Sequence, residues 1–156
     1  MPGYELIGAE EQAEVDDIFK NGGVLFRHSF DAIRQNRWKV RDFEQAFAKS
    51  VSSPFALAVT SGTAALRVAL AVLDLKPGDE VITQSFTFVA TVEAIIESRA
   101  TPVCADIDGT MNMSPESLSK LITPRTKAVI AVHMLGTPAR LFEIEDICKK
   151  NKIALI

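Results

Sequence analysis

The sequence has few of the residues that build metal sites and disulfides. Its 156 residues include two cysteines, Cys104 and Cys148, and two histidines, His28 and His133. Both cysteines lie in apolar-periodic segments, so we expect two buried free thiols rather than a disulfide. Two cysteines and two distant histidines do not provide the local ligand spacing of a zinc site, and no metal is expected.

The sequence also lacks an excess of positive charge. Lysine and arginine number 17 against 20 aspartates and glutamates, which gives a net charge of −3. A nucleic-acid groove or an anionic membrane surface needs a basic stripe, so neither partner is expected. The apolar runs are too short to span a bilayer. Because the opening residues lack the basic and apolar regions of a signal peptide, we expect a cytoplasmic protein.

What the sequence does contain is a regular alternation from residue 55 onward. Short apolar runs of strand type alternate with longer segments whose apolar residues recur three or four positions apart. This alternation is typical of an α/β fold with a mostly parallel sheet. The expected strands are 55–60, 80–83, 102–107, 127–132 and 153–156. The expected helices are 63–75, 86–99, 114–122 and 139–151.

The first 50 residues follow a different pattern. Two amphipathic helices are expected at 10–20 and 41–50, separated by an irregular stretch. We therefore predict an N-terminal helical arm over residues 1–50 and an α/β domain over 51–156. The last run, 153–156, is an apolar strand with no helix after it to cover it, so the domain is expected to be incomplete.

One strand-to-helix junction has the composition of an anion cradle. The sequence Ser61-Gly62-Thr63-Ala64 follows the expected strand and opens an apolar helix. Glycine allows the backbone to approach a ligand closely, and the first amides of a helix are unpaired and favour an anion. Thr63 adds a hydroxyl donor. The alternative is that Ser61 merely caps a buried helix.

The next junction contains two aromatic residues, Phe86 and Phe88. It is expected at the same carboxyl edge of the sheet, where open α/β folds bind ligands. An aromatic side chain at that edge can stack on a planar heteroaromatic ring whose phosphate lies one loop away. The two junctions together predict a site for a phosphorylated ring.

A competing interpretation concerns Asp106-Ile107-Asp108-Gly109-Thr110, which follows an apolar strand. It imitates the D-x-D-G-T motif of haloacid dehalogenase-type phosphatases, in which Asp106 would be the nucleophile and Asp108 the general acid around magnesium. That motif ordinarily begins its domain, however, and no later paired-aspartate motif is present. Asp106 and Asp108 are more simply loop and capping residues.

The order and spacing of the motifs beyond residue 40 are also informative. In order, they are Phe43-Glu44, Ser61-Gly62-Thr63-Ala64-Ala65-Leu66, Pro77-Gly78-Asp79-Glu80, Phe86-Thr87-Phe88, Asp106-Ile107-Asp108, Thr123-Pro124-Arg125-Thr126-Lys127, His133 and Gly136. This order and spacing resemble the nucleotide-sugar aminotransferases of the DegT/StrS type. The segments Met1–Gly8 and Arg37-Trp38-Lys39 also resemble the branch that aminates an eight-carbon octulosonate sugar acid.

The resemblance implies the type I fold of pyridoxal phosphate (PLP) enzymes, a three-layer sandwich around a mostly parallel sheet, of which this chain is the N-terminal part of the large domain. It implies a homodimer that transfers an amino group from an amino acid, usually glutamate, to a keto or aldehydo sugar, free or nucleotide-linked. By the same resemblance, Gly62, Thr63 and the amide of Ala64 hold the phosphate and Phe88 lies against the pyridine ring. His133 and Thr137 are expected near the substrate.

Two parts of the family's machinery have no match in this sequence. They are the aspartate that pairs with the pyridine nitrogen and the lysine that tethers the cofactor and moves the α-proton. We therefore expect no catalytic residue in this chain and no transamination by the chain alone. A natural split subunit, completed by a partner chain that supplies the lysine, is the alternative to a fragment.

Overall fold

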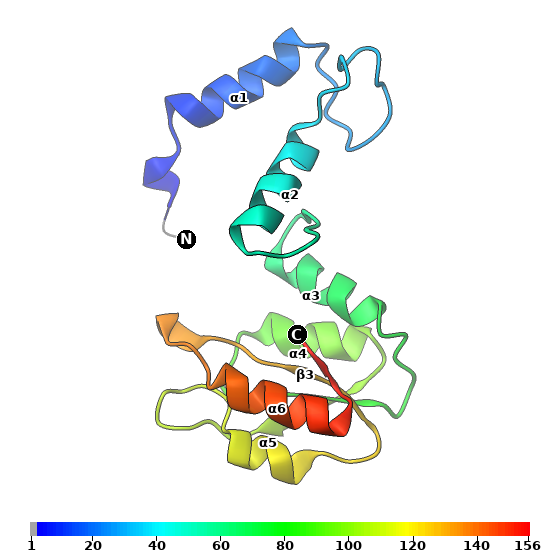
Figure 1. Ribbon diagram of the computed structural model, residues 1–156, viewed down its shortest axis with the longest axis vertical. Coiled ribbons are helices and arrows are strands. Elements are labelled where there is room, and N and C mark those ends of the chain that lie inside the picture. The colour runs from blue at the N-terminus through cyan, green and yellow to red at the C-terminus, as the bar shows by residue number, and fades with distance from the viewer. Residues whose placement is uncertain (1–2) are drawn as a thin grey trace. The chain divides into compact units, whose positions relative to one another are not determined.

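The computed structural model describes residues 3–156, which form two compact units, one ending at Ala58 and the other beginning at Val59 (Figure 1). Met1 and Pro2, part of the segment that resembles the octulosonate branch, lie outside the described residues. The domain boundary predicted after residue 50 stays a prediction. Within residues 3–156, no helix combines the length and the apolar character needed to span a bilayer.

The N-terminal unit contains a short 3₁₀ turn, η1 (Tyr4–Leu6), and two α-helices, α1 (Ala9–Lys20) and α2 (Lys39–Ser50). These helices confirm the segments predicted at 10–20 and 41–50. Irregular chain connects them, and it includes four non-glycine residues at positive φ: Ser29, Phe30, Gln35 and Asn36. Because positive φ is compatible with neither a right-handed helix nor a strand, the connection cannot continue either helix.

Glu44 on α2 ties this irregular chain to its helix. Its Oε1 accepts hydrogen bonds from Arg27 Nη2 at 2.5 Å and from the amide of Ala58 at 2.7 Å. Together these donors, the Ala58 amide first, lower the pKa of Glu44 below its usual value. The Glu44 carboxylate therefore holds two segments against α2: the chain before this helix, at Arg27, and the chain after it, at Ala58.

The second unit is built on a four-stranded sheet in which every neighbouring pair is parallel. Its strands are β1 (Glu80–Gln84), β2 (Thr101–Ala105), β3 (Thr126–Ile130) and β4 (Ala154–Leu155), in the order β2-β1-β3-β4. The central strand β1 lies with Ile82 opposite Val103 of β2 and Val129 of β3. The predicted α/β class and parallel sheet are confirmed.

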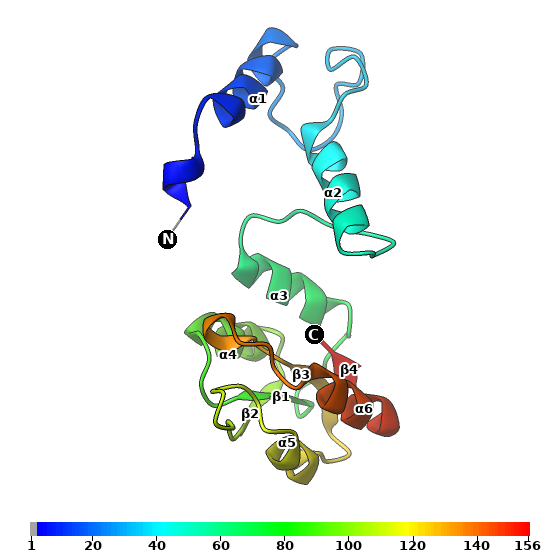
Figure 2. The same cartoon turned by 60° about the vertical axis from the view of Figure 1, so that its left-hand side comes forward.

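Helices cover both faces of the sheet and make the predicted three-layer arrangement (Figure 2). On one face, α3 (Gly62–Ala71) and α4 (Val89–Glu97) pack over a core that includes Leu70 and Ile95. On the other face, α5 (Pro115–Leu121) and α6 (Leu141–Asn151) cover a second core that includes Leu118 and Ile144. A short 3₁₀ turn, η2 (Met134–Gly136), precedes α6.

Two predictions about the strand segments were wrong. Residues 55–60 are not a strand: they have no regular secondary structure, no strand of the described sheet pairs with them, and Phe55 is 85% exposed. A short apolar run can predict a strand, but a strand also needs a hydrogen-bonded neighbour. Cys104 is exposed while Cys148 is buried, because β2 is an edge strand of the described sheet and its Cys104 face is less covered.

Candidate functional site

Ser61 caps the N-terminus of α3, as the alternative interpretation of this motif predicted. Ser61 Oγ accepts a hydrogen bond from the amide of Ala64 at 3.1 Å, and its backbone carbonyl accepts one from the amide of Ala65 at 3.0 Å. The amide of Ala64, expected to hold a phosphate, therefore already has an acceptor in this structure. A second ligand for this amide would have to share it or displace the serine.

The two backbone amides that precede that of Ala64 differ from it in their hydrogen bonding. Within residues 3–156, the amides of Gly62 and Thr63 donate no hydrogen bond. A Cβ placed on Gly62 would meet no atom within 4 Å, so the space above this residue is open. Unpaired amides at the positive end of a ten-residue helix are suited to an oxyanion. Ser61 thus caps the helix and leaves a cradle of two amides and the Thr63 hydroxyl.

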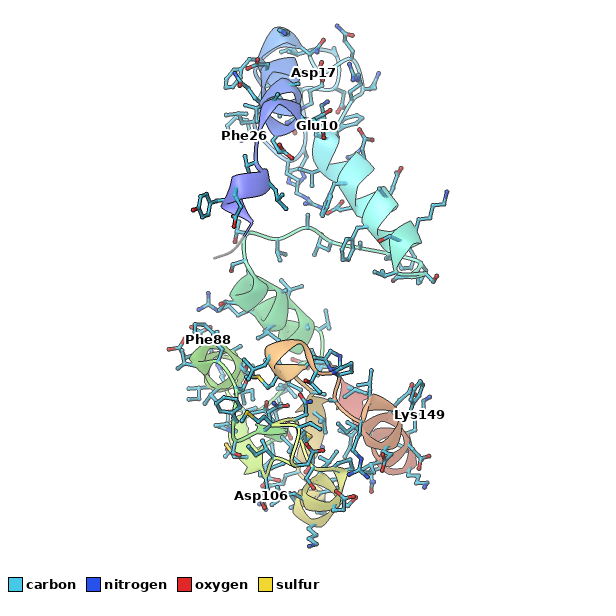
Figure 3. The ribbon with its side chains drawn as sticks, turned by 90° about the vertical axis from the view of Figure 1, so that its left-hand side faces the viewer. Glu10, Asp17, Phe26, Phe88, Asp106 and Lys149 are labelled. Atoms are coloured by element: carbon cyan, nitrogen blue, oxygen red, sulfur yellow. The ribbon has the colours of Figure 1, made fainter. Side chains whose placement is uncertain are left out.

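Phe88 stands at the start of α4, the helix against which α3 packs (Figure 3). Its side chain is 74% exposed, far more than a core phenylalanine would be. Residues 86–88 remain outside the helix, which begins at Val89 rather than at the predicted residue 86. An exposed aromatic ring on a loop beside a ligand-binding edge offers a flat apolar surface on which a planar ring can stack.

The strand order places a change of crossover direction at this edge. The chain leaves β1 toward α4 on one face of the sheet and leaves β3 toward α6 on the other. Since β1 and β3 are neighbours, their connections diverge at the carboxyl edge, and this is the position at which open α/β sheets bind ligands. Phe88 follows β1 and His133 follows β3. The fold thus brings these two predicted residues to the same edge.

The ring of His133 is held by the backbone of its own loop. Its Nδ1 accepts a hydrogen bond from the amide of Ala139 at 3.0 Å. In the neutral ring this assigns the proton to Nε2, because Nδ1 acts as the acceptor. The His133 side chain is exposed, so the Nε2 side offers a donor to a molecule at the edge.

Thr137 follows a tight turn after His133. Leu135 and Gly136 have φ of 52° and 82°, and the amide of Thr137 closes the turn by donating to the carbonyl of Met134 at 2.8 Å. The carbonyl of Thr137 accepts from Asn112 Nδ2 at 3.1 Å. These contacts fix the backbone of Thr137 and leave its hydroxyl without a partner among the described residues.

Two buried amide side chains that the sequence did not indicate hold the loops of this edge. Gln84, at the end of β1, donates to the carbonyl of Phe86 at 2.9 Å and accepts from the amide of Val132 at 3.2 Å. Asn112 accepts from the amide of Met134 at 2.8 Å while it holds Thr137. Both are fully buried. In the sequence, the weak signal for them is a polar residue in or beside a segment predicted as a strand or a loop.

The phosphatase interpretation has no support in the geometry. Asp108 Oδ1 accepts from the amide and the hydroxyl of Thr110 at 2.8 and 2.5 Å, and these donors lower the pKa of the Asp108 carboxyl. The backbone amide of Asp106 donates to Ser117 Oγ at 2.9 Å, which joins this residue to α5. In residues 3–156, no group of three or more potential metal ligands gathers. Both aspartates thus lie in a loop, where local hydrogen bonds hold them.

The family match identifies the class of protein. The model of the DegT/DnrJ/EryC1/StrS aminotransferase family matches residues 7–156. The chain belongs to this family. The cofactor of DegT-type aminotransferases is PLP, and the cradle and the ring surface described above fit its phosphate and its pyridine ring.

Solved structures agree with the family assignment. A 3-amino-5-hydroxybenzoic acid synthase is similar at 33% identity with a TM-score of 0.88, over 99% of this chain and 38% of that one. DesV from S. venezuelae is similar at 30% identity with a TM-score of 0.84, over 97% and 38%. The PLP form of the sugar aminotransferase Spr1654 from Streptococcus pneumoniae is similar at 29% identity with a TM-score of 0.80, over 95% and 36%. This DegT-type chain thus spans under two-fifths of the length of these relatives.

The lysines of the second unit lie away from the cradle and Phe88. Lys76 precedes β1 and Lys127 is near the start of β3. The others stand at or just after the final turns of helices that run back from the carboxyl edge: Lys120, Lys149, Lys150 and Lys152. All six therefore belong to the amino edge of the parallel sheet, opposite the loops that carry Phe88 and His133.

Proposed function

We propose that this chain holds PLP at the carboxyl edge of its sheet and contributes one part of an aminotransferase site. The observation that carries the proposal is the family match over residues 7–156. The open cradle at Gly62 and Thr63 and the exposed ring of Phe88 support it. In this proposal, the two amides and the Thr63 hydroxyl hold the phosphate, and Phe88 keeps water from one side of the pyridine ring.

The remaining residues at the edge have positioning roles in this proposal. His133 offers Nε2–H to the substrate, and Thr137 offers its hydroxyl from a turn whose backbone Asn112 fixes. When bound, PLP supplies an electron sink for the carbanion that forms at the α-carbon of an amino acid. The proton of that carbon must be moved by a lysine, and the six lysines of the second unit stand at the other edge of the sheet.

The reaction that we propose moves the amino group of an amino acid, with glutamate as the donor, to a keto or aldehydo sugar. We further propose that the complete enzyme is a homodimer and that the lysine and the pyridine-pairing aspartate come from a segment outside these 156 residues. That segment belongs either to the same polypeptide or to a partner chain. In both cases this chain alone is inactive.

Complementation tests this proposal. The chain is coexpressed with the remaining segment of a DegT-type enzyme, and the purified complex is supplied with PLP, glutamate and a keto sugar. We expect release of 2-oxoglutarate by the complex and none by either piece alone. Thr63→Val should lower the release, while Thr101→Val, an exposed threonine at the amino edge, should not. Copurification without activity in the unsubstituted complex would contradict the proposal.

A further inference from the structure

The N-terminal unit contains a cavity that the cofactor site does not use. Its volume is about 100 Å³, well above the roughly 10–15 Å³ that a single water requires. It is lined by the end of α1, the irregular chain and the start of α2, and Figure 3 labels two of its lining residues, Asp17 and Phe26. The cavity can therefore accept a small polyatomic group.

Three buried donors without acceptors belong to Arg34 and Trp38, two residues of the cavity lining. They are Nε and Nη2 of Arg34 and Nε1 of Trp38, and no partner for them exists within residues 3–156. A buried donor without an acceptor destabilises the fold, and a charged donor does so more strongly. Nε and one Nη of a guanidinium form the fork that binds a carboxylate or phosphate through two parallel hydrogen bonds. The missing partner thus has the chemistry of an oxyanion.

The other charged groups at the cavity are already paired. Asp17 accepts from Lys39 at 2.7 Å and lies 3.6 Å from Arg37. Arg27 is bound to Glu44, which is not a lining residue. Four cations and one carboxylate therefore face the cavity, and Arg34 is the cation among them without an ion pair in the described residues.

The indole of Trp38 is held in place by a neighbour that does not line the cavity. The guanidinium carbon of Arg41 lies 4.2 Å from the centroid of the Trp38 ring, a cation–π contact. This contact covers one face of the indole ring and leaves its N–H as a donor.

We propose that this cavity is an oxyanion site in which Arg34 and Trp38 bind a carboxylate or a phosphate group. Arg34 provides two N–H groups and the balancing charge, and Trp38 provides a third donor. The site belongs to the N-terminal unit, and the proposal does not depend on PLP binding or on the aminotransferase reaction.

Trp38 is the only tryptophan of the chain, so it reports on its own site. The full 156-residue chain, labelled with ¹⁵N and without PLP, is titrated at constant ionic strength with inorganic phosphate, with D-gluconate and with neutral glucose. We expect saturable changes in tryptophan fluorescence and a shift of the single indole N–H signal with at least one of the two anions. Glucose should change neither.

Three substitutions distinguish hydrogen bonding by the Arg34 guanidinium from nonspecific attraction by the positive charge around the cavity. Arg34→Gln should raise the dissociation constant at least about tenfold, because it removes a charged hydrogen-bonding partner. Arg37→Gln removes a lining cation that is paired with Asp17 and should have a smaller effect. Arg34→Lys keeps the charge but not the fork, and its affinity should fall between those of wild type and Arg34→Gln. Arg99→Gln, at an exposed arginine of the second unit, is the matched control and should have no effect.

Each outcome of the titration assigns or rejects the site. Saturation by phosphate alone identifies a phosphate site, and saturation by gluconate alone identifies a carboxylate site. Either assignment also requires that Arg34→Gln weaken the binding. If neither anion shifts the indole signal, or if Arg37→Gln weakens binding as much as Arg34→Gln, the proposal is overturned. The melting temperature of each variant, followed by circular dichroism, shows whether a loss of binding comes from a loss of fold.

Discussion

Individual side chains at the sheet edge divide into those that face outward and those that hold the loops. The outward group contains Thr63 and Phe88, which have no role in the core of the second unit. Their removal should therefore change ligand binding without a comparable change in folding. This separation makes them suitable for direct tests of the cofactor site.

In the complete or reconstituted enzyme, Thr63→Val removes a hydroxyl donor to a charged phosphate. Since a hydrogen bond to a charged group contributes about 1.5–3 kcal/mol, we expect PLP affinity to fall roughly tenfold or more. Phe88→Ala removes the stacking surface and should also weaken PLP binding. Equilibrium dialysis of the cofactor measures both effects.

The matched controls are Thr101→Val and Phe142→Ala. Thr101 begins the edge strand β2, and Phe142 is 89% exposed on α6. Neither residue belongs to the cradle or to the loop of Phe88. Unchanged PLP affinity in both Thr63→Val and Phe88→Ala would reject the cofactor assignment of these two positions.

A second residue-scale prediction concerns Glu80, which is buried at the start of β1. Thr123 Oγ1 donates to it at 2.5 Å and Arg125 Nε at 2.9 Å, and these contacts, that of Thr123 first, lower the pKa of Glu80. A carboxyl whose folded pKa is depressed stabilises the fold above its unfolded pKa of roughly 4.3. That contribution is lost as the pH falls through the folded pKa.

We therefore expect Glu80→Gln to lower the melting temperature at pH 7 and to have a progressively smaller effect as the solution becomes more acidic. Melting curves from neutral pH to about pH 3 measure this dependence. Glu10→Gln, which removes an exposed carboxylate from α1, is the control. A Glu80→Gln deficit that stays constant down to the lowest pH would contradict the role of the ionised carboxylate.

At the scale of elements, the loops after β1 and β3 are coupled through one side chain. Gln84 bonds to the carbonyl of Phe86 and to the amide of Val132. Gln84→Leu would leave these groups buried without their partner, at a cost of about 1–3 kcal/mol for each group that stays dry. We expect a loss of about 2 kcal/mol in the free energy of unfolding.

Urea unfolding measures this loss, and Gln45→Leu, at an exposed glutamine on α2, is the matched control. Gln84→Leu should also weaken PLP binding, because the loop of Phe88 loses an anchor. Equal stability of the two variants would show that Gln84 does not hold the loops.

The elements also show where sequence patterns succeed. Apolar patterns located β1, β3, α5 and α6 because these elements bury apolar side chains in the two cores. They failed at 55–60, where the apolar run has no neighbouring strand in the described sheet. The family motifs pointed to Gly62, Thr63 and Phe88 as ligand-facing residues. Gln84 and Asn112 were missed because their role depends on contacts between distant loops, which no local spacing encodes.

At the scale of the whole molecule, the position of the lysines leads to the simplest prediction. The purified chain, supplied with PLP, glutamate and a keto sugar, should release no more 2-oxoglutarate than the same mixture without protein. The reason is that the lysines of the second unit stand at the amino edge of the sheet. Release above that background, lost on Lys76→Ala or Lys127→Ala, would show that one of these lysines acts in the reaction.

Because the lysines of the second unit lie at one edge of the sheet, this unit can also be attached to a surface in one orientation. Amine-reactive dyes or an activated surface would attach to this unit at the amino edge, through residues such as Lys127 and Lys149. The loops of Phe88 and His133 would then face away from the attachment points. The second unit, taken by itself, would therefore be attached by one edge of its sheet and be open to ligands at the other.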